Sequence, residues 1–109
     1  MFFTFRQNNS GGSFRVDQKV TEFVIIEAID ANHANSIAES IGIYFDGCEK
    51  GFDCSCCGDR WYRTSDYAGE DKPLLYDKDP SEYKSMFIRK GYAYCYVRYL
   101  DRTVKHLKK

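Results

Sequence analysis

Long apolar runs are absent from this sequence of 109 residues. No stretch approaches the roughly 18 consecutive apolar residues that a membrane-spanning helix needs. The apolar start, residues 1–5, is too short for a secretory signal peptide, and no basic region precedes it. We therefore expect a cytoplasmic protein. Because domains commonly have about 100–150 residues, we also expect residues 1–109 to form a single domain.

Histidine is scarce, and the common catalytic motifs are missing. The two histidines are His33, on the exposed side of a predicted helix, and His106, beside a basic segment. Neither is placed to activate a cysteine nucleophile, which needs an adjacent base. The sequence also contains no phosphate-binding loop, dinucleotide fingerprint or serine nucleophile motif. We therefore predict that the protein is not an enzyme.

A net charge is also missing, since 16 basic residues balance 16 acidic ones. The distribution is uneven: residues 46–82 hold ten acids and five bases, whereas residues 98–109 hold five bases and one acid. A basic end can contact phosphates, but it is equally typical of a solvated surface. The balanced total and the pI of about 6.7 argue against a protein dedicated to duplex nucleic acid.

Alternating and continuous apolar patterns predict the strands. Phe3 and Phe5 alternate with polar residues, as does Phe14, so residues 3–5 and 14–16 are expected to form a hairpin around a six-residue loop. Residues 22–28 are apolar on both faces, which is typical of an interior strand. A strongly alternating segment at residues 92–99 and residues 103–107 should supply a second hairpin. A short strand is expected at residues 61–64.

Two helices are expected. Asp30 is suited to cap a helix that ends before Gly42, and its apolar stripe should face the sheet: Ala34, Ile37, Ala38 and Ile41. Asp79, Pro80 and Glu82 match the start of a second, short helix, with Tyr83, Met86 and Phe87 on one face. The predicted fold class is therefore α+β: an antiparallel sheet with one main packed helix, a second short helix and a cysteine-rich loop.

Four of the five cysteines lie within ten residues, at positions 48, 54, 56 and 57. Cys54, Cys57 and Gly58 match the Cys-x-x-Cys-Gly turn that aims two thiolates at one zinc ion. Cys48 is the third predicted ligand of a structural zinc, and the fourth is left open among Cys56, Cys95 and His106. In the alternative, the thiols are reduced, buried small hydrophobes, an interpretation that fits Cys95 well. Disulfides are disfavoured, because the number of cysteines is odd.

Several polar and aromatic residues are candidates for nucleotide binding. Glycines free backbone N–H groups to contact an anion, and Asn and Ser side chains can recognise base edges. Aromatic rings can stack on bases, and an arginine can pair with phosphate. Each feature also has a structural explanation, either as a turn or as part of the core. The predicted ligand-binding residues are Asn8, Asn9, Ser10, Gly11, Gly12, Tyr44, Arg60 and Trp61.

Three blocks together, at residues 5–14, 43–47 and 53–61, resemble a set of small tailed-phage proteins. They read FRQNNSGGSF, IYFDG and DCSCCGDRW, whereas the resemblance after residue 65 is loose. The set is similar to one that includes sponge proteins, which sequester the cyclic-dinucleotide signals of anti-phage CBASS immunity without cleaving them. The resemblance implies a phage anti-defence protein in the host cytoplasm whose ligand is a cGAMP-like cyclic dinucleotide.

A twofold-symmetric ligand suits a symmetric assembly, so we expect a homodimer or a tetramer. Two other functions remain open. The protein could inhibit a host enzyme by docking through the acidic surface of residues 46–82. It could also be a small zinc protein that contacts nucleic acid through its basic end and three tyrosines: Tyr92, Tyr94 and Tyr96.

Overall fold

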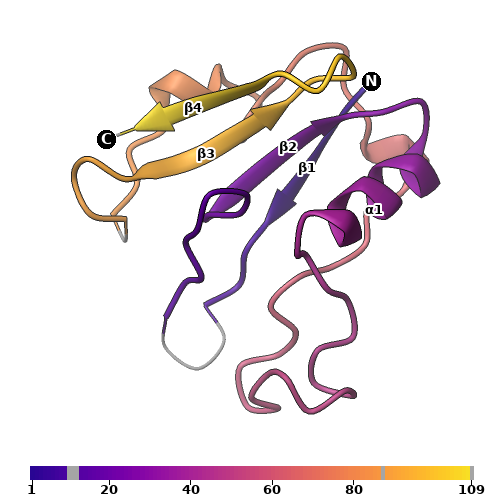
Figure 1. The fold of residues 1–109 in the computed structure, drawn as a ribbon, viewed down its shortest axis with the longest axis vertical. Coiled ribbons are helices and arrows are strands. Elements are labelled where there is room, and N and C mark those ends of the chain that lie inside the picture. The colour runs from indigo at the N-terminus through magenta and orange to yellow at the C-terminus, as the bar shows by residue number, and fades with distance from the viewer. Residues whose placement is uncertain (10–12, 87, 109) are drawn as a thin grey trace.

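The computed structural model describes residues 1–9, 13–86 and 88–108. Four strands form one sheet in the order β1-β2-β3-β4: β1 (Phe2–Arg6), β2 (Phe23–Glu27), β3 (Ala93–Arg98) and β4 (Val104–Lys108). The helix α1 (Ala31–Ser40) lies beside β1 and β2, and β3 and β4 form the other end of the sheet (Figure 1). Within these ranges, no helix has the length and hydrophobicity that a membrane span requires.

The α+β class is confirmed, but the sheet is mixed rather than wholly antiparallel. The outer pairs, β1 with β2 and β3 with β4, are antiparallel, with Phe5 opposite Val24 and Val97 opposite Lys105. The central pair, β2 with β3, is parallel. The chain leaves β2 at Glu27 and, after α1 and the long irregular segment that follows it, returns at Ala93 to the opposite end of the sheet, beside the start of β2. A long crossover of this kind is what parallel neighbours require.

The predicted hairpin of residues 3–5 with 14–16 is wrong, because β1 pairs with β2 and residues 14–16 form no strand. The Gln7 side chain explains the difference. Its amide exchanges hydrogen bonds with the backbone N–H and C=O of Arg15, at 2.5 and 3.0 Å, and also donates to the carbonyl of Thr21. These bonds occupy the Arg15 groups that a strand ladder would use. Residues 10–12 of the predicted loop lie outside the described part of the chain.

Residues 22–28 do contain the interior strand, as predicted. Val24 and Ile26 of β2 belong to the core cluster that includes the helix, whereas Phe23 and Ile25 belong to the cluster on the opposite side, together with Leu75. All four β2 side chains are at most 1% exposed. The strand is therefore covered on both faces, which explains why its side chains are apolar at both odd and even positions.

The main helix is also confirmed. The Asp30 carboxylate accepts a hydrogen bond from the His33 N–H at 2.8 Å and so caps the first turn. Ala34, Ala38 and Ile41 are buried, and the partly buried Ile37 packs against the same core. Gly42, with φ of +105°, ends the helix in a backbone conformation that favours glycine.

The second predicted helix is reduced to a single 3₁₀ turn, Pro80–Glu82, which Asp79 caps through the Ser81 N–H. The chain then becomes extended at Tyr83. The hydroxyls of Tyr83 and Ser85 donate to the Glu22 carboxylate, at 3.1 and 2.6 Å, and so tie this segment to the start of β2. Met86 is 85% exposed, and Phe87 lies outside the described residues. The short strand predicted at residues 61–64 is absent, since the structure assigns none there.

Candidate functional site

The cysteine loop, residues 46–60, leaves the end of α1 and turns back toward β1. The backbone N–H groups of Cys57 and Gly58 both donate to the Cys54 carbonyl, at 3.1 and 3.2 Å. Gly58 has a φ of +87°, in the left-handed region that favours glycine. The tight turn that the Cys-x-x-Cys-Gly spacing predicts is therefore present.

Three exposed thiols gather at this turn. The Sγ atoms of Cys54, Cys56 and Cys57 all lie within 4.8 Å of one another, close enough to hold a metal ion. The prediction of Cys54 and Cys57 as neighbouring ligands agrees with this group, but the prediction of Cys48 as the third ligand does not. The Cys48 thiol instead donates to the Cys54 carbonyl at 3.5 Å, and Cys56 takes the third place.

The two remaining candidates for the fourth ligand lie elsewhere. Cys95 is fully buried within β3, as its alternation with Ala93 and Val97 suggested, and His106 is an exposed residue of β4. Burial raises the pKa of the Cys95 thiol to about 12, so this residue is a neutral part of the core. The described part of the chain therefore offers three clustered ligands rather than four.

Hydrogen bonds within the cluster favour the thiolate form of one cysteine. The thiol of Cys56, followed by the backbone N–H groups of Cys56 and Cys57, stabilises the anion of Cys54 and lowers its pKa. The same contact with Cys54, together with the contact with Cys57, raises the pKa of Cys56 to about 11. Burial and the neighbouring Asp59 raise the pKa of Cys48 to about 11. These hydrogen bonds thus favour the thiolate form of Cys54, the form that binds a cation.

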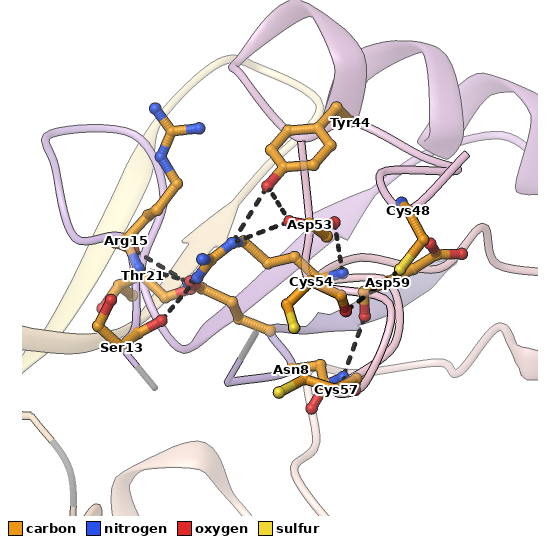
Figure 2. A network of polar contacts seen from close by, with 12 residues as sticks. Asn8, Ser13, Arg15, Thr21, Tyr44, Cys48, Asp53, Cys54, Cys57 and Asp59 are labelled. Atoms are coloured by element: carbon orange, nitrogen blue, oxygen red, sulfur yellow. Dashed lines mark hydrogen bonds and ion pairs between the residues drawn. The ribbon is translucent and has the colours of Figure 1, made fainter. Parts of the chain in front are cut away.

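A buried polar network holds the cysteine loop against β1 and the segment that follows it (Figure 2). The Arg60 guanidinium donates to the Gln7 side-chain oxygen at 2.7 Å and to the Ser13 carbonyl at 2.8 Å. Its Nε donates to the Tyr44 hydroxyl at 3.1 Å and lies 3.7 Å from the Asp53 carboxylate. Asp53 in turn accepts hydrogen bonds from the Tyr44 hydroxyl and the Arg60 N–H.

The structure places the predicted ligand-binding residues Arg60 and Trp61 in the interior of the protein. Arg60 is 8% exposed and its charge is paired within the fold, while Trp61 is 1% exposed and belongs to the core cluster. Neither side chain is available to stack on a base. Tyr44 is only partly buried, but its hydroxyl belongs to the same network and its ring packs edge-on against Phe52. Tyr44 and Arg60 thus hold the loop in place in this structure.

The two described residues of the predicted Asn-Asn-Ser-Gly-Gly loop have different surroundings. The Asn8 amide donates to the carbonyls of Cys57 and Asp59, at 2.8 and 3.1 Å, so it fastens the cysteine turn to the end of β1. The Asn9 side-chain oxygen is buried and has no hydrogen-bond partner among the described residues. Ser10, Gly11 and Gly12 lie outside the described residues.

A cavity of about 680 Å³ lies elsewhere, against β3 and β4, and is termed here the Tyr92 groove. Its walls combine aromatic rings with basic groups: Lys19, Tyr92, Tyr96, His106 and Lys108, with Asp17 as the one acidic residue. The Tyr92 ring is exposed, and the rings of Tyr96 and His106 pack edge-on with centroids 4.8 Å apart. The Tyr96 hydroxyl donates to the Asp17 carbonyl at 2.6 Å, which holds the Tyr96 side chain in place in the groove.

A second cavity of about 540 Å³ adjoins the Tyr92 groove, because both are lined by Val16 and Tyr92. Asn9, Ser13 and Arg89 also line it. The alternating tyrosines and the basic end are the sequence features that mark this region. They predict a nucleic-acid surface here, whereas the nucleotide site is predicted elsewhere. Tyr94 does not join them, since it is buried and its hydroxyl donates to the Pro80 carbonyl.

Together these features define a small α+β protein with a metal-competent cysteine loop and a separate basic, aromatic groove. The chain belongs to a family described as a domain of unknown function, DUF7296, whose model matches residues 1–108. No curated protein and no solved structure matches the chain.

Proposed function

We propose that the protein is a phage anti-defence sponge that binds a cGAMP-like cyclic dinucleotide without cleaving it, in the host cytoplasm. The observation that supports this proposal is the Tyr92 groove. Its volume of about 680 Å³ falls within the range of about 300–1,000 Å³ that is typical of small-molecule sites. The adjoining cavity, which shares Val16 and Tyr92 with the groove, is lined by Asn9, one of the predicted ligand-binding residues.

The chemistry of the groove matches the two kinds of group that a cyclic dinucleotide presents. Lys19 and Lys108 can pair with the phosphates, and Arg89 adds a further cation in the adjoining cavity. The exposed Tyr92 ring, and His106 beside Tyr96, offer flat surfaces for stacking on the bases. The proposal thus keeps the predicted ligand class but moves the site away from Arg60 and Trp61.

A symmetric assembly is part of the proposal. β4 is an edge strand with one partner, β3, and it supplies His106 and Lys108 to the groove. A second copy beside this edge would bring two grooves to one twofold ligand. We therefore propose a homodimer, or a dimer of dimers, in the ligand-bound state.

We also propose that the ion held by the cysteine loop is zinc and that its role is structural. Thiolates select soft or borderline ions, and zinc is the ion most often bound by cysteine turns of this type. The loop supplies no residue to the Tyr92 groove, so nucleotide binding and zinc binding are separable.

Calorimetry with purified protein and a panel of cyclic dinucleotides tests the function. Tyr92→Ala should weaken binding by roughly 1–3 kcal/mol, about five- to 150-fold, because one base loses its stacking partner. Lys108→Ala should weaken binding more at low salt than at high salt. Arg102→Ala is the matched control, since Arg102 is an exposed cation that lines a different cavity.

Three results would contradict the proposal. No heat of binding at tens of micromolar protein would remove the sponge function. Linear products in the released ligand, detected by chromatography, would indicate a nuclease. Equal losses from Tyr92→Ala and Arg102→Ala would show that the groove is not the site. Capture of a host enzyme that depends on the acidic residues 46–82 would favour the inhibitor function instead.

A further inference from the structure

We infer that Cys54, Cys56 and Cys57 form a three-thiolate metal site that is open, unlike a closed structural zinc site. The fourth coordination position of the ion faces solvent and accepts an external ligand. The inference rests on the proposed zinc but is independent of nucleotide binding. It makes Cys56 a metal ligand, a role that the cysteine spacing left open, and it excludes Cys48 from the site.

The sulfur geometry fits a single ion. With Zn–S bonds of about 2.3 Å, two thiolates of a tetrahedral ion lie about 3.8 Å apart. The Sγ atoms of Cys56 and Cys57 are 3.6 Å apart, and both lie within 4.8 Å of the Cys54 Sγ. A shift of less than about one ångström in the Cys54 side chain would therefore complete a three-sulfur face around an ion of this size.

The loop is held in this conformation by contacts that do not involve the three thiols. The Asn8 amide fastens the carbonyls of Cys57 and Asp59. The Asp59 carboxylate accepts the Cys48 N–H at 2.9 Å, and the Asp53 carboxylate accepts the Arg60 N–H at 2.8 Å. The site is thus largely formed before an ion binds.

The same contacts leave the fourth position open. The two acids that flank the turn in sequence, Asp53 and Asp59, are engaged with backbone and hydroxyl donors. Within the described ranges, no fourth His, Cys, Asp or Glu joins the group, and all three of its cysteines are exposed. Metal sites with three protein ligands complete their coordination with water or an added ligand, whereas closed structural sites use four protein ligands. Water would occupy the open position, and a small donor such as imidazole or a free thiol can replace it.

The test is a titration of the reduced full-length protein with Co²⁺ and Cd²⁺, followed by zinc competition. We expect one ion per chain. Cys56→Ser should weaken metal binding by more than about 100-fold, which exceeds the usual effect of changing a group behind a ligand. Cys48→Ser is the matched control, an exchange in the same loop that should leave affinity within about threefold. Circular dichroism of each variant checks that the fold is retained.

The open position has its own measurement. Imidazole added to the Co²⁺-loaded protein should shift the visible absorption bands without releasing the ion. Unchanged bands, or a loss of affinity in Cys48→Ser equal to that in Cys56→Ser, would overturn the inference while leaving the proposed zinc intact. Failure of the native chain to bind Co²⁺, Cd²⁺ or Zn²⁺ would remove both. Neither outcome bears on the calorimetry with cyclic dinucleotides.

Discussion

Replacing Arg60 by methionine tests whether the buried network determines the position of the cysteine loop. Methionine replaces the aliphatic part of the arginine side chain but has no charge and no N–H donor. The Arg60 side chain is 10% exposed and the Asp53 side chain 0%, so the substitution leaves a buried carboxylate without its cation. Removing one partner of such a pair costs about 3–5 kcal/mol. Asp53 keeps two neutral donors, the Tyr44 hydroxyl and the backbone N–H of residue 60, so we expect about 3 kcal/mol.

Urea unfolding followed by the fluorescence of the single, buried tryptophan measures this loss. With a slope of about 1–3 kcal/mol per molar urea, the midpoint should fall by about 1–3 M. Asp46→Asn is the control, because it removes an ion pair with Arg63 whose side chains are 54% and 41% exposed. Such pairs contribute about 0–1 kcal/mol, and asparagine tolerates the φ of +59° at this position.

A double-mutant cycle separates the Arg60–Asp53 interaction from the other bonds of Arg60. If the carboxylate is the main cost, adding Asp53→Asn to Arg60→Met should recover part of the stability, with a coupling of about 1–3 kcal/mol. A loss below about 1 kcal/mol in Arg60→Met, similar to that of Asp46→Asn, would refute the argument that this network fixes the loop.

Two further predictions concern the core and the alkaline limit of stability. Trp61→Ala should cost about 3–5 kcal/mol in urea unfolding, which must be followed by circular dichroism because the variant lacks the single tryptophan. The cost is expected because the indole is 1% exposed within the core, whereas an indole on a binding surface would cost little. Burial, reinforced by the Glu22 carboxylate, raises the pKa of both Tyr83 and Cys95 to about 12, from ordinary values of 10.0 and 9.0. Since the folded state holds these protons more tightly, their contribution is complete below about pH 9 and is lost as the pH rises toward about 12. Unfolding free energies measured from pH 8 to 11 should therefore fall, less steeply in Tyr83→Phe; equal slopes would contradict this assignment.

The parts of the fold that the sequence predicts well are those whose signals are local. Asp30 and Gly42 bracket α1, and the double-sided apolar pattern identifies β2, because a cap, a stop and full burial all appear within a few neighbouring residues. The partner strand of β1, in contrast, cannot be predicted from local signals. Residues 14–16 alternate in a way that suits a strand, but the Gln7 side chain occupies the backbone of Arg15. Pairing depends on this competition and not on strand propensity.

The candidate site shows the same limit. The spacing of Cys54, Cys57 and Gly58 predicts the turn, but only the path of the loop decides that Cys56, and not Cys48, joins it. Arg60 has the chemistry of a phosphate ligand. Its role is decided by Asp53 and by Gln7, which is 53 residues away in sequence. Residue type therefore limits what a side chain can do, and long-range contacts select among the possibilities.

The parallel pairing of β2 with β3 has a consequence for how the chain folds. The centre of the sheet joins Phe23 to Cys95, so it cannot close until most of the chain has been synthesised. Before that, β1 and β2 are a two-stranded unit, which is marginally stable at best in water. Contacts of such wide sequence separation slow folding, and at about 5–20 residues per second synthesis leaves the apolar face of β2 open for several seconds. During that interval the exposed face of β2 is the part of the nascent chain most open to chaperone binding or aggregation.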